Sequence, residues 1–227
     1  MAEITSGLRA VLNHPLIYRG MQWLVGAERL RRHIASLIQP RPEMRVLDIG
    51  CGPADLLAHL PGVNYVGFDS SAGYIEAARR RFGSSGRFFQ EELKADTNLE
   101  LGTFDCIVAV GLLHHLDDQA AARLFQIARE RLQPGGRLIT VDCCWADGQH
   151  PLARWLISRD RGQNVRRLEG YRALATDHFS EVVSQCRHNL LHLPYSHTLL
   201  VCSQPVSKGT SSRSSEPESR PGRPYSS

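Results

Sequence analysis

The chain has 227 residues, of which 42% are hydrophobic and 22% charged, with a formal net charge of +4 at pH 7. This composition excludes a disordered chain, predicts one soluble globular domain with appendages, and is too weakly basic for a dedicated nucleic-acid-binding protein. The sequence shows neither a secretory leader nor an apolar run long enough to cross a membrane, so we expect a cytoplasmic protein with no membrane span.

Residues 1–43 precede the first expected strand. Apolar residues recur at helical spacing from Leu16 to Ile38 and predict an amphipathic helix, which is broken near Gly26 and ends before Pro40. We expect this helix to pack on a sheet or to cover a binding site.

An apolar run that begins at Val46 leads into a turn with two closely spaced glycines, Gly50 and Gly52. Such a run is typical of a buried parallel strand, and the glycines allow the backbone to turn sharply and to approach a ligand. Pro53 suits the first turn of a helix that follows the glycines. A second strand-like run ends at Asp69, about 20 residues further on, where nucleotide-binding α/β proteins place a ribose-binding acid. Asp55 stands where a dinucleotide fingerprint has its third glycine, and its charge disfavours a pyrophosphate there. The pattern therefore favours a ligand with ribose but no phosphate.

The rest of the chain alternates between helical and strand-like patterns. Ser70 or Ser71 is expected to cap a helix that ends near Gly83. The most apolar strand candidate, residues 104–110, is expected at the centre of the sheet. The other expected elements are a strand at 87–90, a helix at 118–132, a strand at 136–143, a helical insertion at about 145–180, and final strands at 182–193 and 197–204.

Four segments between about residues 44 and 203 are similar to the motifs of one known family. Residues 46–54 resemble the glycine loop of the class I (Rossmann-like) S-adenosylmethionine-dependent methyltransferases, and Asp69 resembles their ribose-binding acid. Residues 104–110 resemble the fourth strand of that family, and residues 132–138 the turn into its fifth strand. Among its members, the chain looks most like the type 11, 12 and 25 small-molecule methyltransferases.

The resemblance implies an α/β fold, a three-layer α-β-α sandwich whose mostly parallel seven-stranded sheet has an antiparallel last strand. Residues 44–204 would form the methyltransferase domain, with residues 145–180 as a wall of the substrate site. Residues 1–43 would form a helical lid to which Tyr18 and Gln22 contribute. From Pro205 onward the composition is polar, and we expect a disordered tail at 205–227.

The resemblance also implies that S-adenosyl-L-methionine is the cofactor and that its methyl group passes to an acceptor, which we expect to be a small molecule. Glu92 is the expected partner of the adenine amino group, and Glu91 is the alternative. A non-catalytic S-adenosylmethionine-binding module and an RNA or protein methyltransferase remain alternatives. The expected cofactor-binding residues are Asp48, Gly50, Cys51, Gly52, Asp69, Ser70, Glu92, Val110 and Gly111.

His114 and His115 follow the expected central strand and are the candidates for catalytic proton transfer, because an imidazole titrates close to neutral pH. Alternatively, one histidine packs the loop while the other contacts only the cofactor, since methyl transfer does not require a base. The six cysteines lack Cys-x-x-Cys spacing and are expected to be reduced thiols, so we expect no metal. An anion-binding or aromatic pocket could be formed by Arg159, Arg161, Arg166, Tyr171, Tyr195 and His197, although surface arginines and core tyrosines are commoner.

Overall fold

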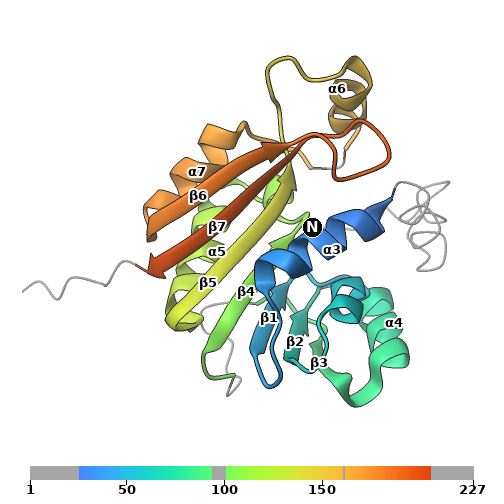
Figure 1. Ribbon diagram of the computed structural model, residues 1–227, viewed down its shortest axis with the longest axis vertical. Helices are drawn as coiled ribbons and strands as arrows, with labels where there is room; N and C mark the ends of the chain where they lie inside the picture. Colours follow the sequence, from blue (N-terminus) through green and yellow to red (C-terminus); the bar gives the residue numbers. More distant parts are fainter. Residues whose placement is uncertain (1–25, 94–100, 161, 206–227) are drawn as a thin grey trace, which may run out of the picture.

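The computed structural model describes residues 26–93, 101–160 and 162–205. Within them, one seven-stranded sheet has the strand order β3-β2-β1-β4-β5-β7-β6 (Figure 1). Strand β7 is antiparallel to its neighbours β5 and β6, whereas the pairings among β1 to β5 are parallel. The predicted sheet with its antiparallel last strand is therefore confirmed. Tyr18, Gln22, Arg161 and residues 206–227 lie outside the described residues.

The strands are β1 (Arg45–Ile49), β2 (Asn64–Phe68), β3 (Gly86–Phe89), β4 (Phe104–Val110), β5 (Leu132–Cys143), β6 (Phe179–Arg187) and β7 (His197–Pro205). The α-helices are α3 (Ala27–Ile38), α4 (Ala72–Phe82), α5 (Asp118–Arg131), α6 (Pro151–Ser158) and α7 (Leu168–Thr176). Short 3-10 turns are η1 (Asp55–His59), η2 (Gly83–Ser85) and η3 (Leu113–His115).

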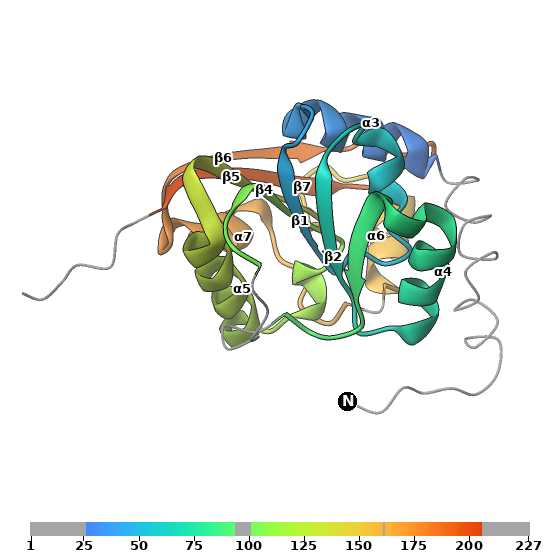
Figure 2. The same ribbon diagram turned by 90° about the horizontal axis from the view of Figure 1, so that it is seen from below.

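Two hydrophobic cores lie on opposite faces of the sheet. Leu47 belongs to the core that includes residues of α5 and α7, whereas its neighbour Val46 belongs to the core that includes residues of α3 and α4. Figure 2 shows these helices on the two sides of the strands. Because successive side chains of a strand point to opposite faces, a strand covered on both faces is mostly apolar. This is why β1 and β4 are mostly apolar, with Asp48 as a buried exception in β1.

The connection from β1 to β2 differs from the expectation. A helix was predicted after Pro53, but the chain forms only the 3-10 turn η1, which starts after Ala54 in a left-handed conformation with φ 56°. The segment between Gly52 and β2 is too short for an α-helix and its return to the sheet. Helix α3 packs against η1 instead and covers this face of the sheet.

Two strand boundaries also differ from the predicted ones. Strand β5 begins at Leu132, not at residue 136, because Leu132 pairs with Phe104 before the register shifts. Strand β6 was expected at 182–193 but spans Phe179–Arg187, and the residues after it form a loop that leads to β7. Helix α7, part of the predicted insertion, packs against β6 and α5 and so belongs to the layers of the fold.

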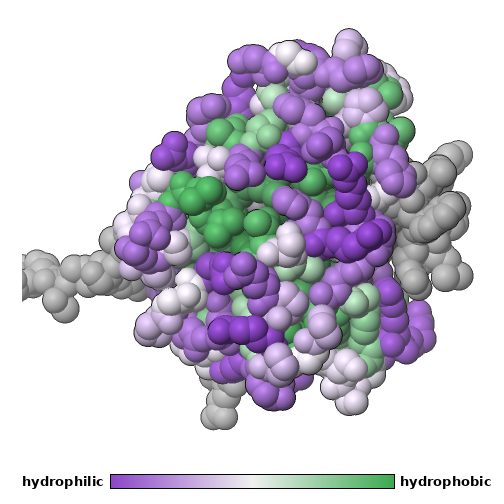
Figure 3. Space-filling view, viewed as in Figure 1, coloured by the Kyte–Doolittle hydropathy of each residue, from purple (hydrophilic) through white to green (hydrophobic). Residues whose placement is uncertain are grey.

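Hydrophobic side chains are exposed on one part of the sheet. Figure 3 shows a hydrophobic patch over β6 and β7, where Val183 pairs with Val201 and is 60% exposed. Among the described residues, no helix is long and apolar enough to cross a membrane.

Candidate functional site

The glycine turn after β1 is tied to the end of β2. The amides of Gly50 and Cys51 both donate to the carbonyl of Phe68, at 2.8 and 2.9 Å. Gly50 has φ 75° and Gly52 has φ 54°, left-handed values that favour glycine. A Cβ on Gly50 would also stand 3.2 Å from the side chain of Leu112. The two glycines are thus required by the turn itself.

Asp69, at the end of β2, closes the turn from the other side. Its Oδ2 accepts from the amide of Gly52 at 2.9 Å, and its Oδ1 accepts from the amide of Ser71 at 2.8 Å. Burial raises the pKa of this carboxyl, while the two backbone hydrogen bonds oppose the rise. Since each carboxylate oxygen has a second lone pair, Asp69 can hold the loop and still accept from a ligand hydroxyl.

Two cavities meet at the glycine turn. The larger cavity has a volume of about 760 Å³, and Gly50, Asp69, Ser70, Glu92 and His115 are among its lining residues. The smaller cavity has a volume of about 320 Å³ and shares Gly50 with the larger one. All the predicted cofactor-binding residues line one or the other cavity, and Glu91 lines the larger one beside Glu92. The predicted residues in the smaller cavity are Asp48, Gly50, Cys51, Gly52, Val110, Gly111 and His114.

This place is where the strand order reverses. Strand β1 lies between β2 and β4, so the crossovers on its two sides run in opposite directions and leave a crevice at the carboxyl ends of the strands. Leu30, Arg31 and Ile34 of α3 form one wall of the smaller cavity. Leu191, Tyr195 and His197, from the loop between β6 and β7 and the start of β7, form another.

Asp48 of β1 is a buried carboxylate with an unused oxygen. The hydroxyl of Tyr65 donates to its Oδ2 at 2.6 Å, and its Oδ1 has no hydrogen-bond partner among the described residues. Burial raises the pKa of Asp48 to about 7, although the bond from Tyr65 opposes the rise. An unpaired buried oxygen of this kind is costly unless a ligand supplies a donor.

Asp55 lines the smaller cavity, and its charge is compensated by two arginines. Its carboxylate forms an ion pair with Arg31 of α3 at 3.1 Å and another with Arg81 of α4. The argument that its charge would repel a pyrophosphate therefore weakens, because two guanidinium groups compensate that charge. The missing third glycine remains as an argument against a dinucleotide.

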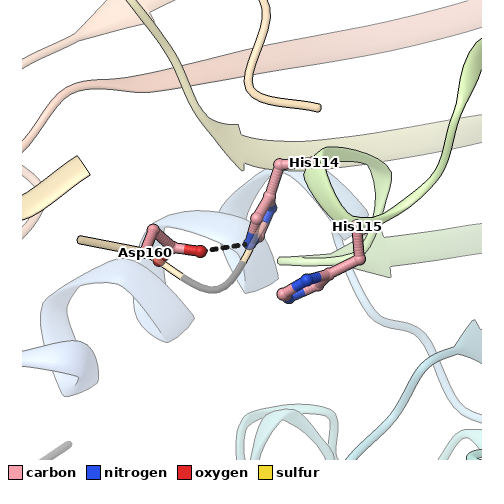
Figure 4. Close-up of side chains that lie close together, drawn as sticks. All are labelled: His114, His115 and Asp160. Atoms are coloured by element: carbon pink, nitrogen blue, oxygen red, sulfur yellow. Dashed lines mark ion pairs between the residues drawn. The ribbon is translucent and has the colours of Figure 1, made fainter. Parts of the chain in front are cut away.

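His114 is held between two carboxylates. Its Nδ1 lies 2.8 Å from Oδ1 of Asp142 in β5, and its Nε2 lies 3.3 Å from Oδ1 of Asp160 after α6 (Figure 4). Burial alone would lower the pKa of His114, but the two carboxylates outweigh burial and raise it to about 12. Burial would raise the pKa of Asp160, but His114 lowers it to about 2. In the free protein, His114 is therefore a cation at neutral pH and cannot accept a further proton.

His115 is exposed and lies beside His114, with the two ring centroids 4.1 Å apart. It lines the larger cavity, whereas His114 lines the smaller one. The two histidines thus stand at the boundary between the cavities. Proton transfer by His115 stays a prediction.

The residues suggested for an anion-binding or aromatic pocket separate into different places. Tyr195 and His197 line the smaller cavity, with their rings 5.0 Å apart. Tyr171 is buried, and its hydroxyl donates to the carbonyl of Cys143. Arg159 lies over the ring of Trp155. Arg166 bonds to Asp118 and to the carbonyls of Leu113 and Leu116, so it fixes the loop that carries the histidines.

Two acidic residues of this site were missed in the sequence. Asp142 interrupts the apolar strand β5, and this could have marked it as a site residue. Asp142 is 1% exposed, and its Oδ2 has no hydrogen-bond partner within the part of the chain that the structure describes. Asp160 gives no local signal, because its contact with His114 spans 46 residues and depends on the position of α6.

Comparisons with known proteins agree with this geometry. Residues 46–136 match the sequence model of a family described as a methyltransferase domain. This part of the chain therefore resembles a methyltransferase domain. The solved apo structure of the S-adenosylmethionine-dependent methyltransferase SibL superimposes with a TM-score of 0.59 and 20% identity, covering 72% of this chain and 51% of that one. At that identity the likeness shows the fold alone.

Two curated relatives have different acceptors in their names. A ribosomal RNA small subunit methyltransferase C from Chromohalobacter salexigens is 32% identical over 63% of this chain and 44% of its own. The O-methyltransferase cnsE from Penicillium expansum is 29% identical over 72% of this chain and 65% of its own. The chain thus spans less than two thirds of the length of either relative.

Proposed function

We propose that the protein is an S-adenosylmethionine-dependent methyltransferase that acts on a small-molecule acceptor. The observation that carries the proposal is the pair of cavities that meet at Gly50, with Asp69 in the larger and Asp48 in the smaller. A nucleoside joined to an amino acid has the chemistry to occupy both, since one carboxylate suits ribose hydroxyls and the other suits an ammonium group.

The residues present fit this cofactor. Asp69 would accept from the ribose, and Glu92 or Glu91 from the adenine amino group. The unpaired Oδ1 of Asp48 would accept from the ammonium group of the methionine part, which removes the cost of leaving a buried oxygen without a donor. The backbone of Gly50, Cys51 and Gly52 would lie against the cofactor, together with Val110, Gly111 and Ser70.

When bound, the cofactor supplies a methyl group that is already activated by the positive charge of the sulfonium. The protein then has to align the acceptor and to exclude water, effects that together can lower a barrier by about 7 to 11 kcal/mol. The smaller cavity is partly lined by the apolar side chains of Leu30, Ile34 and Leu191, which would help to exclude water. His114, as a cation paired to Asp142 and Asp160, would shape the site, and His115 remains the candidate for proton transfer.

A small-molecule acceptor is favoured over RNA by the size of the smaller cavity, about 320 Å³, and by the modest net charge of the chain.

The six cysteines are free thiols, which supports a cytoplasmic location because reducing compartments preserve thiols.

Calorimetric titration of the purified chain with S-adenosylhomocysteine and, separately, with NADH tests the proposed cofactor. We expect S-adenosylhomocysteine to bind and NADH not to bind. A screen of small acceptors with labelled S-adenosylmethionine then tests turnover. Tight NADH binding without S-adenosylhomocysteine binding would overturn the proposal, and cofactor binding without turnover on any acceptor would favour a binding module.

A further inference from the structure

We propose that His114, His115 and Asp160 form a site for a divalent transition-metal ion at the boundary between the two cavities. Each residue offers one ligand atom, and these three atoms lie within 4.8 Å of one another. Figure 4 shows the three side chains converging from two segments of the chain, η3 and the residues after α6.

The separation between the first two ligand atoms matches that of a bound metal. Nε2 of His114 and Oδ1 of Asp160 are 3.3 Å apart. Two ligands at zinc-binding distances of about 2.0 to 2.1 Å, arranged tetrahedrally, are about 3.3 to 3.4 Å apart. The remaining separations involve the exposed His115, whose ligand atom lies within 4.8 Å of the other two.

The surroundings of His114 are those of a metal ligand. In metal sites the ligating histidine usually donates its other ring N–H to a carboxylate, which fixes the tautomer and the ring orientation. Asp142 occupies that position, since its Oδ1 lies 2.8 Å from Nδ1 of His114, and it also accepts from the backbone amide of His114 at 3.2 Å. Nε2 is then the nitrogen left to bind a metal.

Asp160 is also held in place. Its Oδ1 accepts from the amide of Gly162 at 2.8 Å, and its Oδ2 accepts from the hydroxyl of Tyr195 at 3.3 Å. A Cβ at Gly162 would clash with the ring of His114, so only glycine allows the chain to close so tightly over this histidine. The buried His114 and the half-buried Asp160 are thus both positioned by groups outside the site.

The charges of the site favour a dication over a proton. Asp142 and Asp160 bring two negative charges to one imidazole, and a proton on His114 compensates only one of them. A divalent ion that replaces the Nε2 proton, while Nδ1–H stays with Asp142, compensates both. Two imidazoles and one carboxylate suit zinc, iron or manganese better than magnesium, which prefers oxygen ligands.

Three protein ligands leave at least one coordination position open, as in catalytic metal sites. His114 lines the smaller cavity and His115 lines the larger one, so the open position would lie where the two cavities meet. An oxygen-bearing ligand is the class that could occupy it.

The test uses the full chain after treatment with a chelator, titrated with zinc chloride by calorimetry and with cobalt chloride by visible absorption. We expect one zinc ion per chain, and His115→Ala and Asp160→Asn should each weaken zinc binding at least tenfold. His192→Ala, which removes another exposed histidine, should leave it unchanged. These variants avoid the buried His114, whose replacement could prevent folding.

Absence of stoichiometric zinc binding would overturn the proposal. So would zinc binding that neither His115→Ala nor Asp160→Asn affects, or cobalt spectra with thiolate charge-transfer bands, because the metal would then be held by cysteines. Titration of the metal-free protein with S-adenosylhomocysteine, run in parallel, keeps the two proposals separate. Cofactor binding without zinc binding would reject the metal site alone.

Discussion

Replacement of Asp48 by asparagine should make the protein more stable at alkaline pH relative to the wild type, while weakening cofactor binding. Asp48 is 3% exposed, and burial raises its pKa from 3.8 to about 7. Between these two values the folded state binds more protons than the unfolded state, so the stability contributed by this group falls as the pH rises. The asparagine variant lacks this dependence.

The expected magnitude follows from the two pKa values. A rise from 3.8 to about 7 corresponds to about 4 kcal/mol, at 1.36 kcal/mol for each pH unit. The free energy of unfolding of Asp48→Asn, minus that of the wild type, should therefore increase by about 4 kcal/mol between pH 4 and pH 8. Taking this difference removes the constant cost of burying an amide in place of a carboxyl.

Urea unfolding of both proteins without cofactor, at several pH values in this range, measures that difference. If it stays constant with pH, Asp48 is not a buried charged group in the free protein and the reasoning fails. At pH 8 the variant should also bind S-adenosylhomocysteine at least tenfold more weakly, since a charge-assisted hydrogen bond to an ammonium group is worth about 1.5 to 3 kcal/mol. Unchanged affinity would remove Asp48 from the proposed cofactor site.

Three further changes test the rest of the site. Asp69→Ala should weaken S-adenosylhomocysteine binding by more than about 2 kcal/mol in a calorimetric titration, because it removes the ribose contacts and releases the glycine turn. The control Glu76→Ala, on the exposed face of α4, should leave binding unchanged. Nitrogen NMR of the metal-free protein should show His114 protonated at both ring nitrogens from pH 6 to pH 9, and a neutral tautomer at pH 8 would contradict the effect of the two carboxylates. Arg166→Ala should lower the free energy of unfolding, measured in urea, by at least about 2 kcal/mol, since it breaks bonds to Asp118, Leu113 and Leu116. Arg32→Ala, which removes an exposed arginine, is the control. If the two variants lose equally little stability, the loop is held by other contacts.

The side of the cavities that carries the glycine turn could be predicted from the sequence, because its signals are local. The glycine turn and Asp69 each follow a strand, and the carboxyl ends of neighbouring parallel strands lie at the same edge of a sheet. The wrong prediction of a helix after the glycine turn was also a local matter. The 3-10 turn η1 forms there because the segment after Gly52 is short. The length of that segment, which is visible in the sequence, was a better guide than the presence of Pro53.

The opposite wall of the smaller cavity could not be predicted, because its contacts join distant parts of the chain. Asp142 and Asp160 lie 28 and 46 residues from His114, and Tyr195 reaches Asp160 across 35 residues. The boundary of β6 mattered as well. Its early end at Arg187 frees residues 188–196 for the loop that brings Leu191 and Tyr195 to the smaller cavity.

The paired histidines illustrate why residue type alone does not define a catalytic role. Both precede the same helix and differ by one position, yet His114 is buried between two carboxylates and His115 is exposed. An imidazole held by two negative charges is a poor base, because it already carries a proton at neutral pH. The same two charges would also stabilise the proposed metal ion, which would displace that proton. In the metal-free protein, any proton removed from the acceptor would then go to His115, to water, or to solvent after methyl transfer.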